Sequence, residues 1–461
     1  MNEPPLKVTA TNAPLYVESS EAAPGSFVSG VVLTFGTRLL MFVGGLGSSI
    51  VVARWLGPEG LGTLAVLNAM VALALQIGSA GLPSANTYFI AKDRTRLAAA
   101  WANSVFFAFV VGSLIAVAVF LGAEIWPEFF GGVSLSLLMI AAFSIPFQLL
   151  TVLGLNVLLA MGRIGQLNFL DSLSPALALI NAVVVLVIMR ATLPTLVSFN
   201  TGAAIVLSLA MLSVMGRMLV RQNEHRKFRP DPGLAKEMLV YGLKFYISIM
   251  AGVVIFRADL LLVNHFRGAG EAGVYAVAAQ VSFLLLLLPG VIAALLFPRV
   301  ASGHDSTGEF ATQVTRYASA VMLIMCVAAA IGSFLLPYIY GAAFADSQFQ
   351  LLILLPGIYL MGIESVLVQH FTGTGLPAAI PAFWLITLAI NLGLNLVLVP
   401  RFGARGAALA STLSYALISG LVAVYFCVKT ARRPVDIFLP RRHEVRDLFA
   451  RSRRAIFSRS V

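Results

Sequence analysis

The sequence predicts an all-α polytopic membrane protein with about 12 transmembrane helices in two six-helix lobes. Apolar residues form 59% of the 461-residue chain and charged residues only 11%, against roughly 45–50% and 25% in soluble domains. These apolar residues come in runs long enough to cross a bilayer as helices, not in alternating strand-length segments. A single strongly charged interior stretch, 217–233, divides the runs into six plus six. This composition excludes a soluble globular protein and a disordered chain.

Apolar runs between charged or Gly/Pro-rich breaks place the helices. The predicted spans are 28–53, 61–90, 99–122, 134–160, 170–189, 193–216, 239–264, 273–297, 314–338, 349–371, 379–399 and 405–429. Proline inside a span removes a backbone hydrogen bond, so kinks are expected at Pro83, Pro146, Pro289 and Pro356.

The charged stretch and the ends of the chain set the predicted domain boundaries. The predicted segments are a cytoplasmic disordered tail (1–27), an N-lobe (28–218), a cytoplasmic connector (219–238), a C-lobe (239–430) and a basic amphipathic cytoplasmic tail (431–461). From Arg441 onward the last segment has the pattern of a helix that lies on anionic inner-leaflet lipid.

The two lobes contain a weak internal repeat. Shifting the chain by 211 residues aligns VVARWLGPEGLGTLAV (51–66) with LVNHFRGAGEAGVYAV (262–277). Gly57 and Gly62 then pair with Gly268 and Gly273. Because each lobe has an even number of spans, both lobes enter the membrane from the same side. The repeat is therefore parallel, related by an axis along the membrane normal.

The distribution of Lys and Arg predicts the orientation. Of the 31 basic residues, 23 fall on the side that carries both chain ends and 5 on the opposite side. Basic residues are enriched in cytoplasmic loops, so both termini are expected in the cytoplasm. The net charge of +11 is then an orientation signal and gives no reason to expect a nucleic-acid partner.

Three segments carry a resemblance to a known family. They are SSIVVARWLGPEGLGTLAV (48–66), RADLLLVNHFRGAGEAGVYAVAAQ (257–280) with LLLLLPGVIAALLFPRVAS (284–302), and NLGLNLVLVPRFGARGAALASTLSYAL (391–417). The chain resembles, from about residue 28 to 429, the polysaccharide transporter (oligosaccharide flippase) family of the multidrug/oligosaccharidyl-lipid/polysaccharide (MOP) exporter superfamily. It lacks the two extra C-terminal helices of the fourteen-span relatives, which disfavours a peptidoglycan precursor as cargo.

The resemblance implies a central cavity between the lobes and transport by alternating access. It also implies the cargo, an oligosaccharide on a polyprenyl diphosphate lipid, flipped across the bacterial inner membrane for surface or exopolysaccharide (O-antigen, capsule) synthesis. The expected partners are this lipid-linked oligosaccharide, anionic inner-leaflet lipids, and the polymerase and export proteins of the polysaccharide. No cofactor or metal is expected, and an H⁺ or Na⁺ gradient is the candidate energy source.

Three basic residues inside spans are candidates to bind the diphosphate: Arg38, Arg257 and Lys244. A charge at mid-bilayer costs roughly 2.5–3.5 kcal/mol on insertion scales, and guanidinium groups bind phosphate oxygens in bidentate fashion. In the alternative, Arg257 pairs with a neighbouring helix, while Arg38 and Lys244 extend to the cytoplasmic headgroups.

Acidic and uncharged polar residues complete the candidate set. Asp259 and Glu364 could bind a proton or Na⁺ and couple its gradient to motion, although Asp259 could instead pair with Arg257. Asn86, Tyr88 and Gln280 are candidates for the sugar hydroxyls, with interhelical hydrogen bonding as their alternative role.

An ion-coupled multidrug or cation exporter of the same superfamily is the alternative function. An acidic cleft would favour that exporter and a basic cleft the flippase, but the acids and bases inside spans balance numerically. An enzyme is not expected, because every loop on the outer side is short. The phosphate-binding pattern GxxxxGK[ST] of ATP-driven transporters does not occur in the sequence.

Overall fold

The computed structural model describes residues 24–222, 228–301, 305, 308–375 and 377–438. Within these residues every regular element is helical. The elements are α1 (Pro24–Ser79), α2 (Leu82–Lys92), η1 (Arg94–Arg96), α3 (Leu97–Ile125), η2 (Pro127–Phe130), α4 (Leu135–Phe143), α5 (Ile145–Ala160), α6 (Ile164–Ala182), η3 (Val183–Ile188), α7 (Leu193–Arg221), α8 (Pro232–Arg267), α9 (Ala269–Leu285), α10 (Leu287–Ala301), α11 (Glu309–Gly332), η5 (Ser333–Leu335), α12 (Leu336–Tyr340), η6 (Ala342–Phe344), α13 (Ser347–Gly373), α14 (Ala379–Thr430) and α15 (Val435–Phe438).

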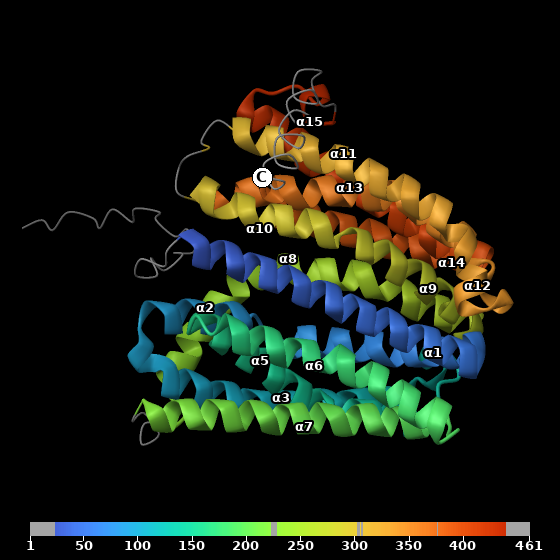
Figure 1. Ribbon diagram of the computed structural model, residues 1–461, viewed down its shortest axis with the longest axis horizontal. Helices are drawn as coiled ribbons and strands as arrows, with labels where there is room; N and C mark the ends of the chain where they lie inside the picture. Colours follow the sequence, from blue (N-terminus) through green and yellow to red (C-terminus); the bar gives the residue numbers. More distant parts are fainter. Residues whose placement is uncertain (1–23, 223–227, 302–304, 306–307, 376, 439–461) are drawn as a thin grey trace, which may run out of the picture.

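Ten helical stretches in the described residues are long and apolar enough to cross a membrane. Two of them, in α1 and α14, contain a turn at Gly57 (φ 68°) and at Gly403 (φ 59°). Unbroken, α1 with its 56 residues would measure about 84 Å, far more than a bilayer core of about 30 Å. Figure 1 shows α1 running to one end of the molecule and returning. With α1 and α14 each crossing twice, the ten stretches give the twelve predicted spans.

Prolines break three of the predicted spans. Pro83, Pro146 and Pro289 each lie in the first three residues of a new helix, where a missing N–H costs least. The predicted kinks at these positions are confirmed. Pro356 lies inside α13, which continues unbroken from Ser347 to Gly373.

The long helices lie side by side, with α7 at one edge, α1 and α8 in the middle and α11 near the other edge (Figure 1). We call α1–α7 the N-lobe and α8–α15 the C-lobe. The end where α1 begins and α14 stops is called the terminal end (left in Figure 1). The opposite end, which carries the turns at Gly57, Gly268 and Gly403, is called the hairpin end.

Buried apolar side chains form two clusters that do not follow the two lobes. One cluster joins the hairpin-end parts of α1, α4 and η3 to the C-lobe helices, including α9, α13 and α14. The other contains the terminal-end parts of α2, α3, α5 and α7 together with the start of α8. The lobes therefore share one apolar core at the hairpin end.

The turns at the hairpin end also contact one another. The Glu271 Oε1 atom, near the start of α9, accepts a hydrogen bond of 2.7 Å from the Ala404 N–H, just after the turn in α14. A carboxylate at this position satisfies a free N–H and complements the positive end of the helix dipole. Arg267 donates to the carbonyls of Pro400 (3.0 Å) and Arg401 (3.2 Å) in the same turn.

Candidate functional site

The lobes meet at the hairpin end through two glycines that occupy equivalent positions of the internal repeat. A Cβ on Gly62 would lie 1.7 Å from the carbonyl oxygen of Ala269. A Cβ on Gly273 would lie 2.0 Å from the carbonyl oxygen of Pro58. Ala269 and Pro58 are also related by 211 residues, so the two contacts are reciprocal. Reciprocal contacts of this kind are what a two-fold axis between the lobes produces.

Two further contacts across the lobes obey the same relation. Arg54, just before the turn in α1, donates from Nε to the carbonyl of Ile339 at 2.8 Å and from Nη2 to that of Tyr338. His265, just before the turn after α8, has its Nδ1 atom 2.9 Å from the carbonyl oxygen of Glu128. Because a carbonyl oxygen only accepts, Nδ1 is the donor.

Residues Arg54 and His265 are 211 positions apart, and so are Glu128 and Ile339. We call the Arg54–Ile339 and His265–Glu128 contacts the paired latches. Each latch joins the last turn of one lobe's first span to a short turn of the other lobe, and Asn264 adds a hydrogen bond of 2.8 Å to the Phe130 carbonyl. The paired latches and the glycine contacts close the hairpin end.

The terminal end is joined differently: within the residues that the structure describes, the contacts across the lobes there come from the first half of α8. Tyr241 stacks on Tyr88 of α2, with ring centroids 4.4 Å apart and planes at 14°. Glu237 lies 3.1 Å from Arg96 in an exposed ion pair. The Asn103 side chain exchanges two hydrogen bonds with the Asp231 backbone, at 2.9 and 2.8 Å. Thus the first half of α8, although it belongs to the C-lobe, packs against the N-lobe at this end.

The described part of α1 contacts its own lobe at the corresponding level. Arg38 forms an ion pair of 3.5 Å with Asp171 of α6, and its side chain is half exposed. Gly44 packs against the Pro175 carbonyl and Gly47 against Leu179, both on α6. Arg38 thus has an acidic partner in its own lobe in this conformation.

Asp259 is buried and fully engaged within the C-lobe. Its carboxylate accepts hydrogen bonds from the Tyr275 hydroxyl, the Ser411 hydroxyl (3.0 Å) and the Leu260 N–H (2.7 Å). It thereby ties α8 to α9 and α14. The alternative role of Asp259, a direct ion pair with Arg257, is not seen among the described residues, where Arg257 is exposed and lies within 4 Å of no acid.

Glu364 has a contrasting environment. Its side chain on α13 is only 2% exposed, and its Oε1 atom has no hydrogen-bond partner among the described residues. A buried carboxylate without partners is costly unless a proton or a cation compensates its charge.

The remaining predicted residues divide into three groups. Asn86 is fully buried and exchanges hydrogen bonds with Ser104 of α3, at 2.9 and 3.2 Å, so in this conformation it has the interhelical role. Tyr88 belongs to the stack with Tyr241, while Gln280 of α9 is half-buried with its Nε2 atom beside Gly45 of α1. Lys244 is on α8, but its side chain lies outside the described residues.

A small polar cavity of about 50 Å³ lies inside the N-lobe, between α1, α5 and α7. Its polar lining is Asn68, Ser144, Gln148, Asn200 and Thr201. This volume holds a water molecule or two but no sugar.

The paired latches were not among the predicted residues, although the sequence contained a signal for them. Arg54 and His265 fall opposite each other when the repeat segments are aligned. Their acceptors could not have been found in this way, because both are backbone carbonyls.

Comparison with known proteins gives a family match and several relatives. Residues 27–304 match the family model described as "Polysaccharide biosynthesis protein". Two proteins of Haloferax volcanii are similar: the probable low-salt glycan biosynthesis flippase Agl15, 22% identical over 203 residues (43% of each chain), and the probable flippase AglR, 28% identical over 168 residues (34% of this chain and 35% of AglR). The matched segments thus span less than half of either relative.

Solved structures share the fold across nearly the whole chain. The lipid II flippase MurJ in an inward closed conformation has a TM-score of 0.70, covering 89% of both chains at 14% identity. An inward-facing multidrug resistance MATE transporter of the MOP superfamily has a TM-score of 0.69, covering 87% of this chain and 98% of that one, also at 14% identity. An outward-facing MATE transporter has a TM-score of 0.62, covering 87% and 95%, at 14% identity.

Proposed function

The chain belongs to the polysaccharide biosynthesis protein family, and on this premise we propose that it is a flippase for polyprenyl-diphosphate-linked oligosaccharides that works by alternating access. The observation that carries the proposal is the reciprocal closure of the hairpin end. Two lobes related by a two-fold axis, held by contacts that can all separate together, suit a rocking motion. The two similar proteins of Haloferax volcanii are described as probable flippases.

The conformation follows from the orientation that we propose, with the terminal end cytoplasmic. The hairpin end then faces outward and is closed, so cargo would enter between the lobes from the cytoplasmic leaflet. The greater similarity to the inward-facing than to the outward-facing MATE transporter supports this assignment.

Arg257 is the favoured contact for the diphosphate. It is exposed in the middle of the part of α8 that can span the membrane (Tyr246–Arg267) and carries no acidic partner within 4 Å in the described residues. A guanidinium that faced lipid there would be costly. Arg38 would serve only after separating from Asp171. A diphosphate offers both cations the bidentate geometry that arginine prefers.

Glu364 is the favoured site for a coupling ion. Asp259 already accepts three hydrogen bonds, whereas Glu364 has an unpartnered oxygen. A proton or Na⁺ would bind this carboxylate and compensate its charge in one state of the lobes, and would dissociate from it in the other state.

We propose the cytoplasmic membrane as the location, a surface or exopolysaccharide unit as the cargo, and polymerase and export proteins as partners.

Flipping of a fluorescent polyprenyl-diphosphate oligosaccharide in proteoliposomes tests the proposal directly. We expect Arg257→Ala to slow flipping by roughly tenfold or more, as the loss of a charged hydrogen bond requires, with partial recovery in Arg257→Lys. The matched control is Arg190→Ala, which removes an exposed arginine near the start of α7.

Deletion of the gene in the native host is a second test, and it should remove surface polysaccharide. Unchanged polysaccharide together with increased drug sensitivity would instead support the multidrug exporter.

A further inference from the structure

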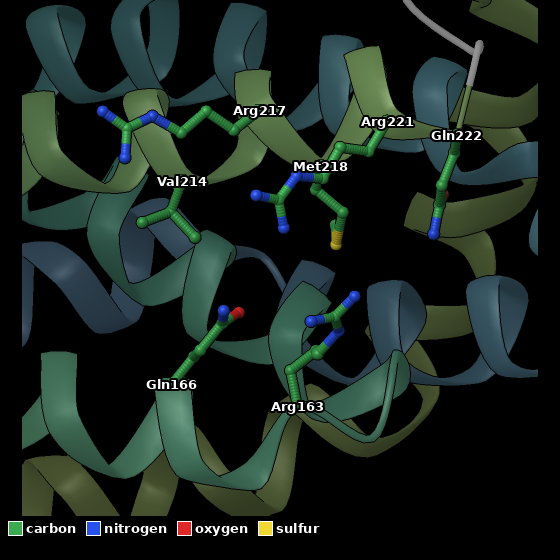
Figure 2. Close-up of a pocket in the computed structure, with 7 residues that line it drawn as sticks. All are labelled: Arg163, Gln166, Val214, Arg217, Met218, Arg221 and Gln222. Atoms are coloured by element: carbon green, nitrogen blue, oxygen red, sulfur yellow. The ribbon is translucent and has the colours of Figure 1, made fainter.

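A basic cavity of about 230 Å³ lies at the terminal end of the N-lobe, outside the lobe interface. It is formed between the first turn of α6 and the last two turns of α7. The lining residues are Arg163, Gln166, Val214, Arg217, Met218, Arg221 and Gln222. Figure 2 shows Arg221 and Met218 reaching from α7 toward Arg163 and Gln166, which reach from α6.

The described charges that line this cavity are all positive. Three of its seven lining residues are arginines and none is acidic. None of these arginines forms an ion pair with an acid in the part of the chain that the structure describes. Like charges that share one cavity repel each other, and an anion between them turns this repulsion into attraction.

The backbone contributes in the same direction. The helix α6 begins at Ile164 directly beside the cavity, and the side chain of its N-cap residue, Arg163, makes no hydrogen bond to the first N–H groups. Free N–H groups and the positive end of the helix dipole favour an anion at this position. On the other side, Met218 and Val214 provide an apolar wall.

We propose that this cavity binds the phosphate group of a membrane lipid in the adjacent leaflet. The cavity lies where two membrane-spanning helices end, which is the level of lipid headgroups, and basic pockets between such helices bind anionic headgroups. Guanidinium groups match phosphate oxygens, and the apolar wall would contact the start of the acyl or prenyl chain. The phosphate belongs either to an anionic phospholipid or to the cargo lipid, and the second source rests on the proposed function.

Lipid binding to the purified full chain, measured by native mass spectrometry, tests the proposal. The probes are phosphatidylglycerol, undecaprenyl diphosphate, and diacylglycerol as a lipid without phosphate. We expect Arg163→Gln/Arg221→Gln to weaken binding of at least one phosphate lipid by roughly tenfold or more, since each lost charged hydrogen bond costs about that factor. Diacylglycerol binding should not change.

The matched control is Arg94→Gln/Arg229→Gln, which removes two exposed arginines from the same end of the molecule and from outside the cavity. Equal weakening in both double variants would overturn the proposal, because it would indicate attraction to a diffuse positive surface. If the cavity variant fails to fold, Gln166→Glu decides the matter. A carboxylate in the cavity should weaken phosphate binding, and unchanged affinity would overturn the proposal.

The two sources give different results, and each supports a phosphate site. A phospholipid site binds phosphatidylglycerol more tightly, and its loss leaves flipping unchanged at saturating cargo. A cargo site binds undecaprenyl diphosphate more tightly, and its loss slows flipping at low cargo concentration. Since binding is measured without transport, failure of the proposed function would leave the phospholipid result standing.

Discussion

The two ends of the molecule are joined by different kinds of contact. At the hairpin end the contacts come in equivalent pairs: the glycine contacts of Gly62 and Gly273, and the paired latches of Arg54 and His265. At the terminal end, in the described residues, α8 makes the contacts across the lobes, whereas Arg38 of α1 pairs with Asp171 of its own lobe.

This difference indicates that the lobes are held together more tightly at the hairpin end than at the terminal end. Paired contacts around an axis separate together when the lobes rotate, so the hairpin end should open in a single step. At the terminal end, α8 can leave the N-lobe while α1 stays in place. We therefore expect substitutions at the hairpin end to change the balance of conformations more than substitutions at the terminal end.

The largest effect on the balance of conformations is expected from Gly62→Leu. Its side chain would overlap the Ala269 carbonyl, and overpacking of this kind costs about 3 kcal/mol at the upper end of the usual range. The closed hairpin end should be depopulated, with flipping reduced roughly 100-fold. Spin-label distances across the hairpin end measure the opening. Gly202→Leu, where a Cβ meets no atom within 4 Å, is the control and should behave as wild type.

Both paired latches should contribute to closure. We expect His265→Ala to cost about 1 kcal/mol of closure, typical of one net hydrogen bond, and Arg54→Ala about 2 kcal/mol, because Arg54 donates two hydrogen bonds. The double variant should cost about 3 kcal/mol, because the contacts share no partner. The same spin-label distances report the shift. If one substitution shifts the closure and its equivalent does not, the two-fold description of this end is wrong.

A smaller effect is expected at the terminal end from Tyr241→Leu. It removes the stack on Tyr88, and aromatic pairs contribute about 1 kcal/mol beyond their buried area. Mass-labelling of a cysteine placed at the start of α8 should report faster exposure there, with hairpin-end distances unchanged. Phe334→Leu, which changes an exposed ring elsewhere, serves as the control.

The smallest effect is expected from the Arg96–Glu237 ion pair. Its side chains are 41% and 58% exposed, and exposed pairs contribute about 0.5 kcal/mol, less in high salt. Glu237→Arg should slightly increase labelling at the start of α8, and the swapped pair Arg96→Glu/Glu237→Arg should restore it. A shift as large as that of Gly62→Leu would contradict the ranking of the two ends.

The sequence was sufficient for the spans and for the interruptions at Pro83, Pro146 and Pro289, because apolar length and proline positions act locally, but Pro356 does not interrupt α13. It also placed Gly62 and Gly273 at equivalent positions. The sequence could not show that Arg54 and His265 donate to particular backbone carbonyls, because every residue has a backbone carbonyl and none is marked by its side chain. It likewise could not separate Asp259, which is engaged by its neighbours, from Glu364, which has an unpartnered oxygen, because this depends on how α9, α13 and α14 pack.

Reversible bridging of the hairpin end tests the central claim most directly. Cysteines would replace Arg54 and Tyr338 in a chain whose own buried Cys326 and Cys427 are changed to serine. A short reagent with a cleavable disulfide would then join the lobes. We predict that bridging stops flipping in proteoliposomes and that reductant restores it. Flipping at the unbridged rate by the bridged protein would contradict the account.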